Sequence, residues 1–593
     1  MEHLTPEQLQ LLLEGIQKPG RYIGNEVGIK SKTLQQIKER EDMVLAALAF
    51  PDLYEVGMPN LGIQILYEII NRYPYFNAER VFAPWADFEQ SLTGNGFRLF
   101  SLENRIFLDK FDFIGFSLAH ELLYTNMLNM IKLSGLELRA GQRDRRLPLI
   151  AAGGPSTVNP QPVSPFLDFM FIGEAEEAVT EILERIRKYK AGSQSKQLLL
   201  KDLSRVEGVY VPSIYSIHYF PWGQIKSIEP EIKVKKRTVK DLDRWPIVKN
   251  PVIPNIRVVH DRFAVEIMRG CSRCCRFCQA GNIYRPVRSR DADMLARDTI
   301  EGLKGTGYDE VSMLSLSSSD YRDMEKLLGP LNSYARDRRI SISLPSLRMD
   351  SFGLGLAELI GSGRKTGLTF APEAGSQRMR NIIGKKMSEQ ELLDCAELAF
   401  SKGWEKIKLY FMIGFPFESL DDVAAISQLI NTIIATGRKT LGSRKYRRLN
   451  VSVSINALVP KPFTPFQWVP LDHPEALAEK ISMIASRLPR KIVKLHWNDF
   501  NKSKLEAVMS RGDIRVADAV EEAWRLGARF DNWTDVFDFS LWQQAFENSH
   551  LGMDFYSSRH YGLQEILPWD VVDIGISKKF LLSQYRKAGG YEK

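Results

Sequence analysis

The sequence AVEIMRGCSRCCRFC, residues 264–278, decides the fold of the central part of this 593-residue chain. Its apolar start, Ala264–Met268, is predicted to be a strand, and Gly270 turns the chain into a cysteine-rich loop. Three cysteines of this loop follow the spacing C-x3-C-x2-C: Cys271, Cys275 and Cys278. Three thiolates on one short loop can bind three irons of a 4Fe–4S cluster, which leaves the fourth iron open to a substrate or cofactor.

Other uses of these thiols remain open. Two overlapping C-x2-C pairs, Cys271/Cys274 and Cys275/Cys278, would allow zinc, although structural zinc sites usually separate their pairs by about a dozen residues. A disulfide would be out of place in the reducing cytosol. Inert thiols are the remaining alternative. The fifth cysteine, Cys395, lies in a helical pattern and is expected to be a small buried side chain.

The loop opens a series of strands that alternate with helical patterns. The strand candidates are Ala264–Met268, Glu310–Leu316, Ile340–Leu344, Gly367–Phe370, Lys406–Ile413 and Asn450–Leu458. Six such units predict a partial (β/α)6 TIM-like barrel over residues 257–475, smaller than the closed eight-fold form. The catalytic end of such a barrel is the end where the strands' carboxyl termini lie.

A second α/β unit precedes the barrel. Its strand candidates are apolar throughout: Met43–Phe50, Phe111–Ser117, Leu147–Ala152 and Phe169–Ile172. Strands of this kind, alternating with helices, predict a doubly wound parallel sheet over residues 43–195, with ligands at the loops after the strands. A helical lead-in (1–42), a linker with a short β pair (196–256) and a mostly helical C-terminal region (476–593) complete the predicted α/β chain.

The composition excludes several classes of protein. Hydrophobic residues make up 44% and charged residues 26%, which is typical of a globular chain and not of a disordered one. The longest apolar run, Met43–Phe50, is far too short to span a membrane, and the N-terminus shows no signal segment. The sequence therefore predicts a cytoplasmic protein with no membrane segment. The net charge of +8 does not by itself identify a partner.

The cysteine loop, with Phe277 before its last cysteine, resembles that of the radical S-adenosylmethionine superfamily. The resemblance implies that S-adenosylmethionine chelates the open iron through its amino and carboxylate groups. One electron from the cluster, supplied by a donor such as flavodoxin or ferredoxin, then releases a 5′-deoxyadenosyl radical that abstracts hydrogen from the substrate. Cys274 departs from the pattern, in which a small residue is more usual. It is interpreted as a bystander, with an exchange of register with Cys275 as the alternative.

The resemblance also implies S-adenosylmethionine contacts at later strand ends. These are Ser317 and Ser318 for the methionine amino group, Glu373 and Ser376 near the ribose, and Ile413 and Gly414 at the adenine edge, together with Phe277 in the loop. The alternative for each segment is an ordinary strand-end loop, in which Gly, Pro and Ser are common.

The N-terminal unit resembles cobalamin-binding domains. Asp52, Tyr54 and Gly57 follow the D-x-H-x-x-G signature with tyrosine in place of histidine, so cobalamin would bind without a histidine ligand from the protein. Further elements of the signature follow at later strand ends: Ser117, Gly153, Gly154, Gly173 and Glu174. The alternative is a doubly wound domain that does not bind cobalamin.

Nearly the whole chain is similar to a family of bacterial cobalamin-domain radical enzymes without an assigned substrate. The resemblance implies methylation of an unactivated carbon in an unknown substrate. A cobalamin-free radical enzyme that isomerises, cyclises or oxidises its substrate is the alternative. Methylthio transfer is disfavoured, because it needs three further cysteines for a second cluster.

Transfer RNA or ribosomal RNA is the substrate class considered for the cobalamin-free alternative. The hypothesis rests on a basic run, Lys233–Lys240, and on aromatic and basic residues near the C-terminus: Trp524, Arg525, Arg529 and Trp533.

Overall fold

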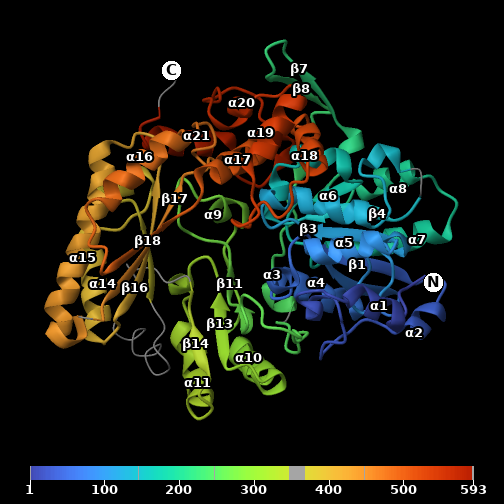
Figure 1. Cartoon of the computed structure of the whole chain (residues 1–593), viewed down its shortest axis with the longest axis horizontal. Helices are drawn as coiled ribbons and strands as arrows, with labels where there is room; N and C mark the ends of the chain where they lie inside the picture. The colour runs from blue at the N-terminus through green and yellow to red at the C-terminus, as the bar shows by residue number, and fades with distance from the viewer. Residues whose placement is uncertain (1, 144–145, 246, 346–367, 447, 591–593) are drawn as a thin grey trace.

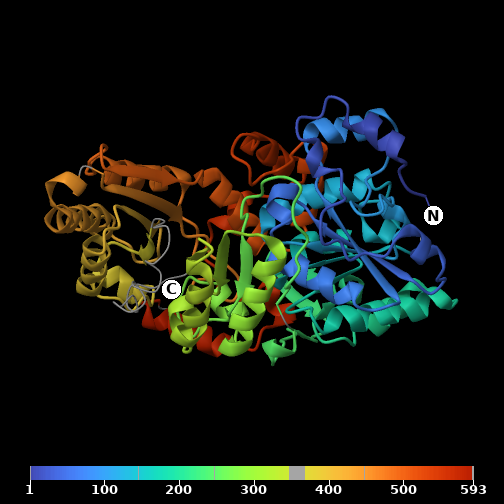
Figure 2. The ribbon, with the colours of Figure 1, turned by 90° about the horizontal axis from the view of Figure 1, so that it is seen from below.

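A computed structural model describes residues 2–143, 146–245, 247–345, 368–446 and 448–590. A sheet domain built from the N-terminal half lies beside a barrel-like domain, and the C-terminal helices lie between the two at one end (Figures 1 and 2). The predicted α/β fold class is confirmed, with parallel sheets in both domains.

The N-terminal sheet has the strand order β2-β1-β3-β4-β5-β6. Its strands are β1 (Val44–Phe50), β2 (Phe76–Phe82), β3 (Phe113–Ser117), β4 (Leu149–Gly153), β5 (Phe169–Phe171) and β6 (Val209–Tyr210). Neighbouring strands from β2 to β5 run parallel, whereas β6 pairs with β5 in the antiparallel sense. The sheet thus includes two strands, β2 and β6, that the sequence analysis did not assign to it.

Helices cover both faces of this sheet. Successive residues of β1 point to opposite sides, and both sets are apolar, so each face needs helices to bury it. Val44, Ala46 and Leu48 pack with α4 (Leu61–Asn71) and α7 (Ala178–Ala191). Leu45 and Ala47 belong to the core that also holds α5 (Ala86–Gly94) and α6 (Tyr124–Leu133). This continuous apolar strand therefore forms the centre of a doubly wound domain, as predicted.

The barrel-like domain consists of two parallel sheets in the described residues, β10-β13-β14 and β15-β16-β17-β18. The strands are β10 (Phe263–Glu266), β13 (Glu310–Leu314), β14 (Ser341–Ser343), β15 (Leu368–Glu373), β16 (Lys406–Ile413), β17 (Asn450–Ala457) and β18 (Val493–Trp497). The six predicted strands are confirmed. The strand β18 was missed, and it lies in the region predicted to be mostly helical.

Helices cover the outer face of the barrel sheets. They are α10 (Ala292–Thr306), α11 (Met324–Arg336), α14 (Glu389–Ser401), α15 (Leu420–Tyr446) and α16 (Pro474–Ala485). Burial alternates along β17, where Val451, Val453 and Ile455 are buried in the core formed with α14, α15 and α16. The strand ends that follow the cysteine loop are therefore held by a packed scaffold.

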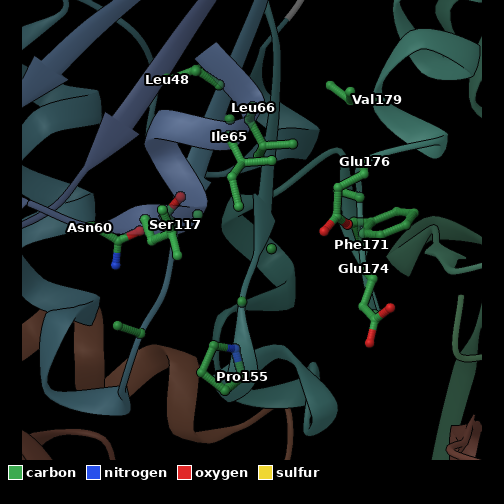
Figure 3. Close-up of a pocket in the computed structure, with 18 of the residues that line it drawn as sticks. Leu48, Asn60, Ile65, Leu66, Ser117, Pro155, Phe171, Glu174, Glu176 and Val179 are labelled. Atoms are coloured by element: carbon green, nitrogen blue, oxygen red, sulfur yellow. The ribbon is translucent and has the colours of Figure 1, made fainter. Parts of the chain in front are cut away.

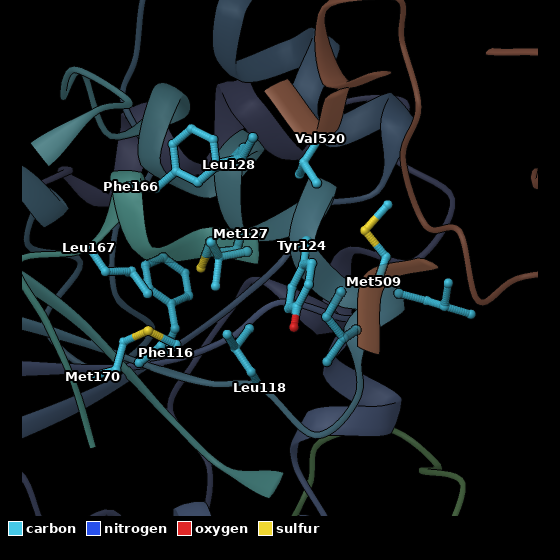
Figure 4. Close-up of a cluster of buried hydrophobic side chains, with 14 of the residues drawn as sticks. Phe116, Leu118, Tyr124, Met127, Leu128, Phe166, Leu167, Met170, Met509 and Val520 are labelled. Atoms are coloured by element: carbon cyan, nitrogen blue, oxygen red, sulfur yellow. The ribbon is translucent and has the colours of Figure 1, made fainter. Parts of the chain in front are cut away.

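The C-terminal helices connect the two domains. They are α17 (Phe500–Arg511), α18 (Val516–Arg525), α19 (Phe539–Asn548), α20 (Met553–Ser557) and α21 (Lys578–Lys587). Figure 4 shows Met509 of α17 and Val520 of α18 beside Tyr124 and Met127 of α6, in one buried cluster. This core joins the C-terminal region to the sheet domain.

The remaining elements are short. The helices are α1 (Pro6–Leu13), α2 (Leu34–Lys38), α3 (Tyr54–Gly57), α8 (Lys196–Leu203), α9 (Ala280–Ile283) and α13 (Gln377–Ile382), and the strands are β7 (Ser216–Tyr219), β8 (Ile225–Glu229), β9 (Val234–Lys235), β11 (Met268–Arg269), β12 (Arg288–Ser289) and β19 (Val572–Asp573). Within the described chain, every helix is too short or too polar to cross a membrane.

Candidate functional site

The cysteine loop leaves the barrel through a turn that requires glycine. Gly270 follows β11 with φ +88°, and a Cβ atom there would lie 2.6 Å from the carbonyl oxygen of Tyr284 and 2.7 Å from that of Pro286. No other residue fits this turn without displacing the backbone. The glycine brings the loop close to α9, which follows it, and fixes where the cysteines lie.

Three of the four loop thiols lie within electrostatic reach of one another. The pKa of Cys278 is raised to about 11, mainly by burial, and the charges of Cys275 and Cys271 contribute in the same direction. The Gly281 N–H donates to the Cys278 sulfur at 3.3 Å and opposes that shift. This donor would stabilise the thiolate form that binds iron.

Cys274 has different surroundings. Its side chain is exposed, and its sulfur accepts a hydrogen bond from Arg285 Nη2 at 3.1 Å. The donor set therefore fits a cluster held by Cys271, Cys275 and Cys278. No group of three or more His, Cys, Asp or Glu side chains in the described parts of the chain is arranged to hold a metal ion as it stands.

Two of the predicted S-adenosylmethionine segments lie near the cysteine loop. The Phe277 ring lies 5.9 Å from the Phe415 ring, just beyond the end of β16, where Ile413 and Gly414 lie. Glu373, at the end of β15, is close enough for its charge to raise the pKa of Cys278, and Lys385 Nζ lies 3.3 Å from its carboxylate. The ends of β15 and β16 thus meet at the loop.

The predicted serines are engaged within the protein. Ser317 donates to Asp320 at 2.8 Å, and the hydroxyls of Ser318 and Ser315 lie 2.9 Å apart. Asp320, which the prediction did not single out, binds Arg273 of the cysteine loop at 2.5 Å. The hydroxyl of Ser376 caps α13 by accepting from Met379 N and donates to Asp422. The predicted segments are therefore brought together, but these hydroxyls have local partners.

A cavity of about 580 Å³ opens at the carboxyl ends of β1, β3, β4 and β5 and reaches the cysteine loop. Its walls are mostly apolar, and Figure 3 shows Glu174 and Glu176 on one side with Asn60 and Ser117 on the other. Of the predicted cobalamin residues, five line it: Ser117, Gly153, Gly154, Gly173 and Glu174. Arg269 and Gly270, immediately before Cys271, form part of the same wall. Its volume lies in the usual range for small-molecule sites.

The other three predicted cobalamin residues are not among the described residues that line this cavity. Asp52 accepts from the indole N–H of Trp533 at 2.9 Å, and the hydroxyl of Tyr54 donates to Glu26 at 3.1 Å. Gly57 packs against Phe82, whose ring would lie 2.5 Å from an added Cβ. Local packing and hydrogen bonding account for these residues in this structure.

A charged network that the sequence analysis did not identify connects the two domains at this cavity. Arg269 Nη2 lies 2.7 Å from Glu176, and Arg269 Nε lies 2.8 Å from Glu266. Glu174, predicted as a cobalamin contact, binds both Arg288, at 2.6 Å, and Arg269, at 3.2 Å. The residues of this network can be found in the sequence, as the G-E-x-E stretch at residues 173–176 and the arginine before Gly270. That they form ion pairs with one another could be seen only in the folded structure.

The residues behind the RNA hypothesis are largely bound within the chain. Lys236 is buried and donates to the Ile283 and Arg285 carbonyl oxygens at 2.7 and 2.6 Å, and Arg237 pairs with Glu177 at 2.7 Å. Near the C-terminus the indoles donate to Asn129 and Asp52, while Arg525 pairs with Glu521 and Arg529 donates to the Trp524 carbonyl oxygen. These six side chains therefore have partners within the chain, whereas Lys233, Lys235 and Lys240 of the same run are exposed, so RNA as a substrate stays a hypothesis.

Comparison with known proteins identifies two families of domain in the chain. Residues 265–430 match the model of the radical SAM superfamily, and residues 62–212 match the model of radical SAM proteins, N-terminal. A protein of Methanocaldococcus jannaschii described as uncharacterized is 29% identical over 475 residues, which cover 79% of this chain and 89% of that protein.

More distant similarities involve enzymes with named activities. A tRNA-2-methylthio-N(6)-dimethylallyladenosine synthase of Sorangium cellulosum is 27% identical over 271 residues, which cover 41% of this chain and only 50% of that enzyme. The solved structure of the radical S-adenosylmethionine methyltransferase TsrM from Kitasatospora setae, with cobalamin and a 4Fe–4S cluster bound, has a TM-score of 0.50 and 11% identity. That similarity covers 86% of this chain and 99% of TsrM, and it is a similarity of fold.

Proposed function

We propose that this chain, whose residues 265–430 match the model of the radical SAM superfamily, is a radical enzyme that binds cobalamin in the cavity between its two domains and methylates an unactivated carbon. The observation that carries the proposal is the position of that cavity. One wall consists of the strand ends of the sheet domain, and another includes Arg269 and Gly270, next to the first cluster cysteine.

The residues of the chain have distinct tasks in this proposal. Cys271, Cys275 and Cys278 hold the cluster, while Glu373 and the β16 end at Gly414 hold S-adenosylmethionine beside it. Gly153 lines the cavity without a side chain and lets the ligand approach the backbone closely. Gly154 is required by the packing of the protein itself, because a Cβ there would lie 2.5 Å from the Leu118 carbonyl oxygen. When bound, the cluster supplies one electron to S-adenosylmethionine and cobalamin supplies the methyl group.

Methylation is the reaction that best explains why one chain has both a cluster loop and a cavity for cobalamin. Ordinary methyl transfer to a nucleophile needs a lone pair on the acceptor atom, which an unactivated carbon lacks. A largely apolar cavity that adjoins the cluster loop would keep the methyl donor close to the carbon and exclude water from it.

A cobalamin-free radical reaction is the second candidate, with the sheet domain acting only as a cover for the substrate. The buried contacts of Asp52 and Tyr54 favour this alternative, because these two signature residues bind partners within the protein and do not line the cavity, whereas the five later ones do. Methylthio transfer is not proposed, since the chain has five cysteines, four of them in one loop, and lacks the three that a second cluster needs.

The enzyme requires a low-potential electron donor, which we propose to be a flavodoxin or ferredoxin. We propose that the enzyme works in the reducing cytoplasm, where its five cysteines would stay thiols.

Anaerobic purification with cobalamin supplied, followed by an optical spectrum and a corrinoid assay, tests the proposal. Ala119 is exposed and lines the cavity, so Ala119→Trp narrows the site without disturbing a core. Ala191→Trp, at an exposed position at the end of α7, is the matched control. We expect stoichiometric corrinoid in the wild type and the control, and at least a tenfold loss in Ala119→Trp with unchanged iron content. A brown, corrinoid-free wild-type protein would support the cobalamin-free candidate instead.

A further inference from the structure

A hairpin outside both proposed ligand sites carries aromatic rings at its tip. The strands β7 and β8 pair in the antiparallel sense, and they project from the molecule beside the C-terminal helices (Figure 1). The tip between them holds Phe220 and Trp222, whose rings stack with centroids 4.7 Å apart and planes 5° from parallel. Trp222 is 63% exposed. Phe220 therefore supports an indole that remains open to a further flat ring.

A cavity of about 620 Å³ lies beside the hairpin tip. Phe220 and Lys226 of the hairpin line one side of it, and residues 560–566 line the other. Among its described lining residues the one carboxylate is that of Glu565, which pairs with Arg559 at 2.5 Å. The cavity thus offers an aromatic ring and a lysine to a ligand, while its negative charge is neutralised within the protein.

The segment that contains the hairpin is basic. Residues 213–240 hold six lysines and arginines and two glutamates, a net charge of +4. Lys226, Lys233 and Lys240 are exposed, and none of the three forms an ion pair with another described residue. The ion pairs of this segment involve other side chains. The hairpin and the chain that follows it therefore present positive charge that is available to an anionic partner.

A second basic element connects this cavity with the carboxyl end of the barrel strands. The helix α21 contains four lysines and arginines and no acidic residue. The hydroxyl of Tyr585 in this helix lies 3.1 Å from Nε2 of His560, which lines the cavity, and the Tyr585 ring lies 6.5 Å from the Phe417 ring. Phe417 lies three residues beyond Gly414, a predicted S-adenosylmethionine contact. A ligand held at the hairpin therefore has one basic helix between it and the proposed cofactor site.

Exposed aromatic rings beside lysines without ion pairs are typical of proteins that bind single-stranded nucleic acids. Each base presents a flat face that stacks on an aromatic ring, and each phosphate presents a charge that a lysine neutralises. Loops of folded RNA present unstacked bases of this kind, whereas the bases of duplex DNA are paired and stacked. An acidic protein would match the charges but not the stacked rings. Single-stranded RNA therefore fits this surface best.

We propose that the surface formed by Phe220, Trp222, Lys226, Lys233 and Lys240, together with the adjoining cavity, docks a single-stranded stretch of RNA, which is the substrate of the enzyme. This inference deepens the proposed function by naming the class of substrate, and it rests on that function for the reaction that follows docking. The stacked rings hold a base, the lysines hold the phosphates around it, and the strand continues along α21 toward the barrel.

The test measures binding to the full-length protein without S-adenosylmethionine or reductant. Fluorescence anisotropy follows a labelled oligouridine of about twelve nucleotides and, in parallel, the deoxyoligonucleotide of the same length. Trp222→Ala removes the exposed ring, and Trp497→Ala, 53% exposed at the end of β18, is the matched control. Lys226→Gln removes one charge, and Lys494→Gln, at an exposed position in β18, is its control.

We expect Trp222→Ala to weaken oligouridine binding at least fivefold with an unchanged salt dependence, because stacking involves no charge. Lys226→Gln should lower the slope of log affinity against log salt by about 0.7, as expected for one lost phosphate contact. Both control variants should bind as the wild type does.

Equal losses in Trp222→Ala and Trp497→Ala would overturn the docking site. Tighter binding of the deoxyoligonucleotide would overturn RNA as its occupant, and binding of neither oligonucleotide would overturn the proposal in favour of an acidic protein. Because the assay contains no cofactor, each of these failures is distinguishable from a failure of the proposed function, which would appear as absent corrinoid or absent 5′-deoxyadenosine.

Discussion

Arg269 Nη2 lies 2.7 Å from the Glu176 carboxylate, and this contact joins the turn before the cluster cysteines to the loop after β5 of the sheet domain. Both residues line the same cavity, and the Arg269 side chain is only 12% exposed. The relationship matters because it fixes the cysteine loop relative to the proposed cobalamin site. A single guanidinium thus positions two sites that must cooperate.

Arg269→Met should destabilise the protein strongly. The substitution removes the guanidinium that Glu174, Glu176 and Glu266 share in a largely buried network. Breaking a buried ion pair by removing one partner lowers the free energy of unfolding by about 3–5 kcal/mol. Thermal unfolding monitored by circular dichroism measures the effect. Arg297→Met is the matched control, because that arginine is 69% exposed and a surface pair contributes about 0–1 kcal/mol. Equal losses in both variants would show that Arg269 is an ordinary surface arginine.

Ser376→Ala distinguishes a helix cap from a cofactor contact. The hydroxyl accepts from Met379 N at 3.0 Å at the start of α13, and losing such a cap costs about 1 kcal/mol. We therefore expect a small drop in stability with an unchanged KM for S-adenosylmethionine. A tenfold higher KM for S-adenosylmethionine at unchanged stability would instead show that Ser376 contacts the cofactor.

Tyr54→Phe should lower stability without releasing corrinoid. Its hydroxyl donates to the buried Glu26 and accepts from Asn255 N at 3.1 Å, so its removal leaves buried polar groups unpaired at a cost of about 1–3 kcal/mol. Corrinoid content and chemical denaturation are measured on the same preparation. Corrinoid lost from a fully stable variant would mean that Tyr54 contacts the cofactor directly.

Cys274→Ala and Cys275→Ala settle the register of the cluster ligands. The Cys278 thiol senses Cys275 and Cys271, while Cys274 contacts Arg285 on the exposed side. Iron content after anaerobic reconstitution should therefore stay near the wild-type level in Cys274→Ala and fall at least fivefold in Cys275→Ala. The reverse result would exchange the roles of the two cysteines.

The sequence predicted the elements whose patterns are uniform and missed those that depend on the tertiary structure. The barrel strand Lys406–Ile413 was predicted with its observed bounds. The strand β2 was missed because Glu79 and Arg80 interrupt its apolar pattern; both are buried, and Glu79 is satisfied by Ser101 and Asn104 from a distant loop. Such partners are not visible before the chain folds.

The candidate site shows the same division. The spacing of the cysteines is local and can be read from the sequence, and in the structure the Cys278 thiol senses the charges of Cys275 and Cys271. That these three cysteines hold the cluster stays a prediction. The segment at Asp52–Gly57 was matched to the cobalamin signature by residue type alone. The direction of the Asp52 side chain depends on its hydrogen bond with the distant Trp533, and that of Tyr54 on its hydrogen bond with Glu26. The pairing of Arg269 with Glu176 likewise depends on how the two domains meet.

The most direct test of the central claim is the metal and product analysis of the anaerobically reconstituted wild-type protein. The account predicts about four irons per chain, all lost together in Cys271→Ala, and 5′-deoxyadenosine formed from S-adenosylmethionine under dithionite. One zinc ion per chain, or adenosyl release that persists in Cys271→Ala, would contradict it.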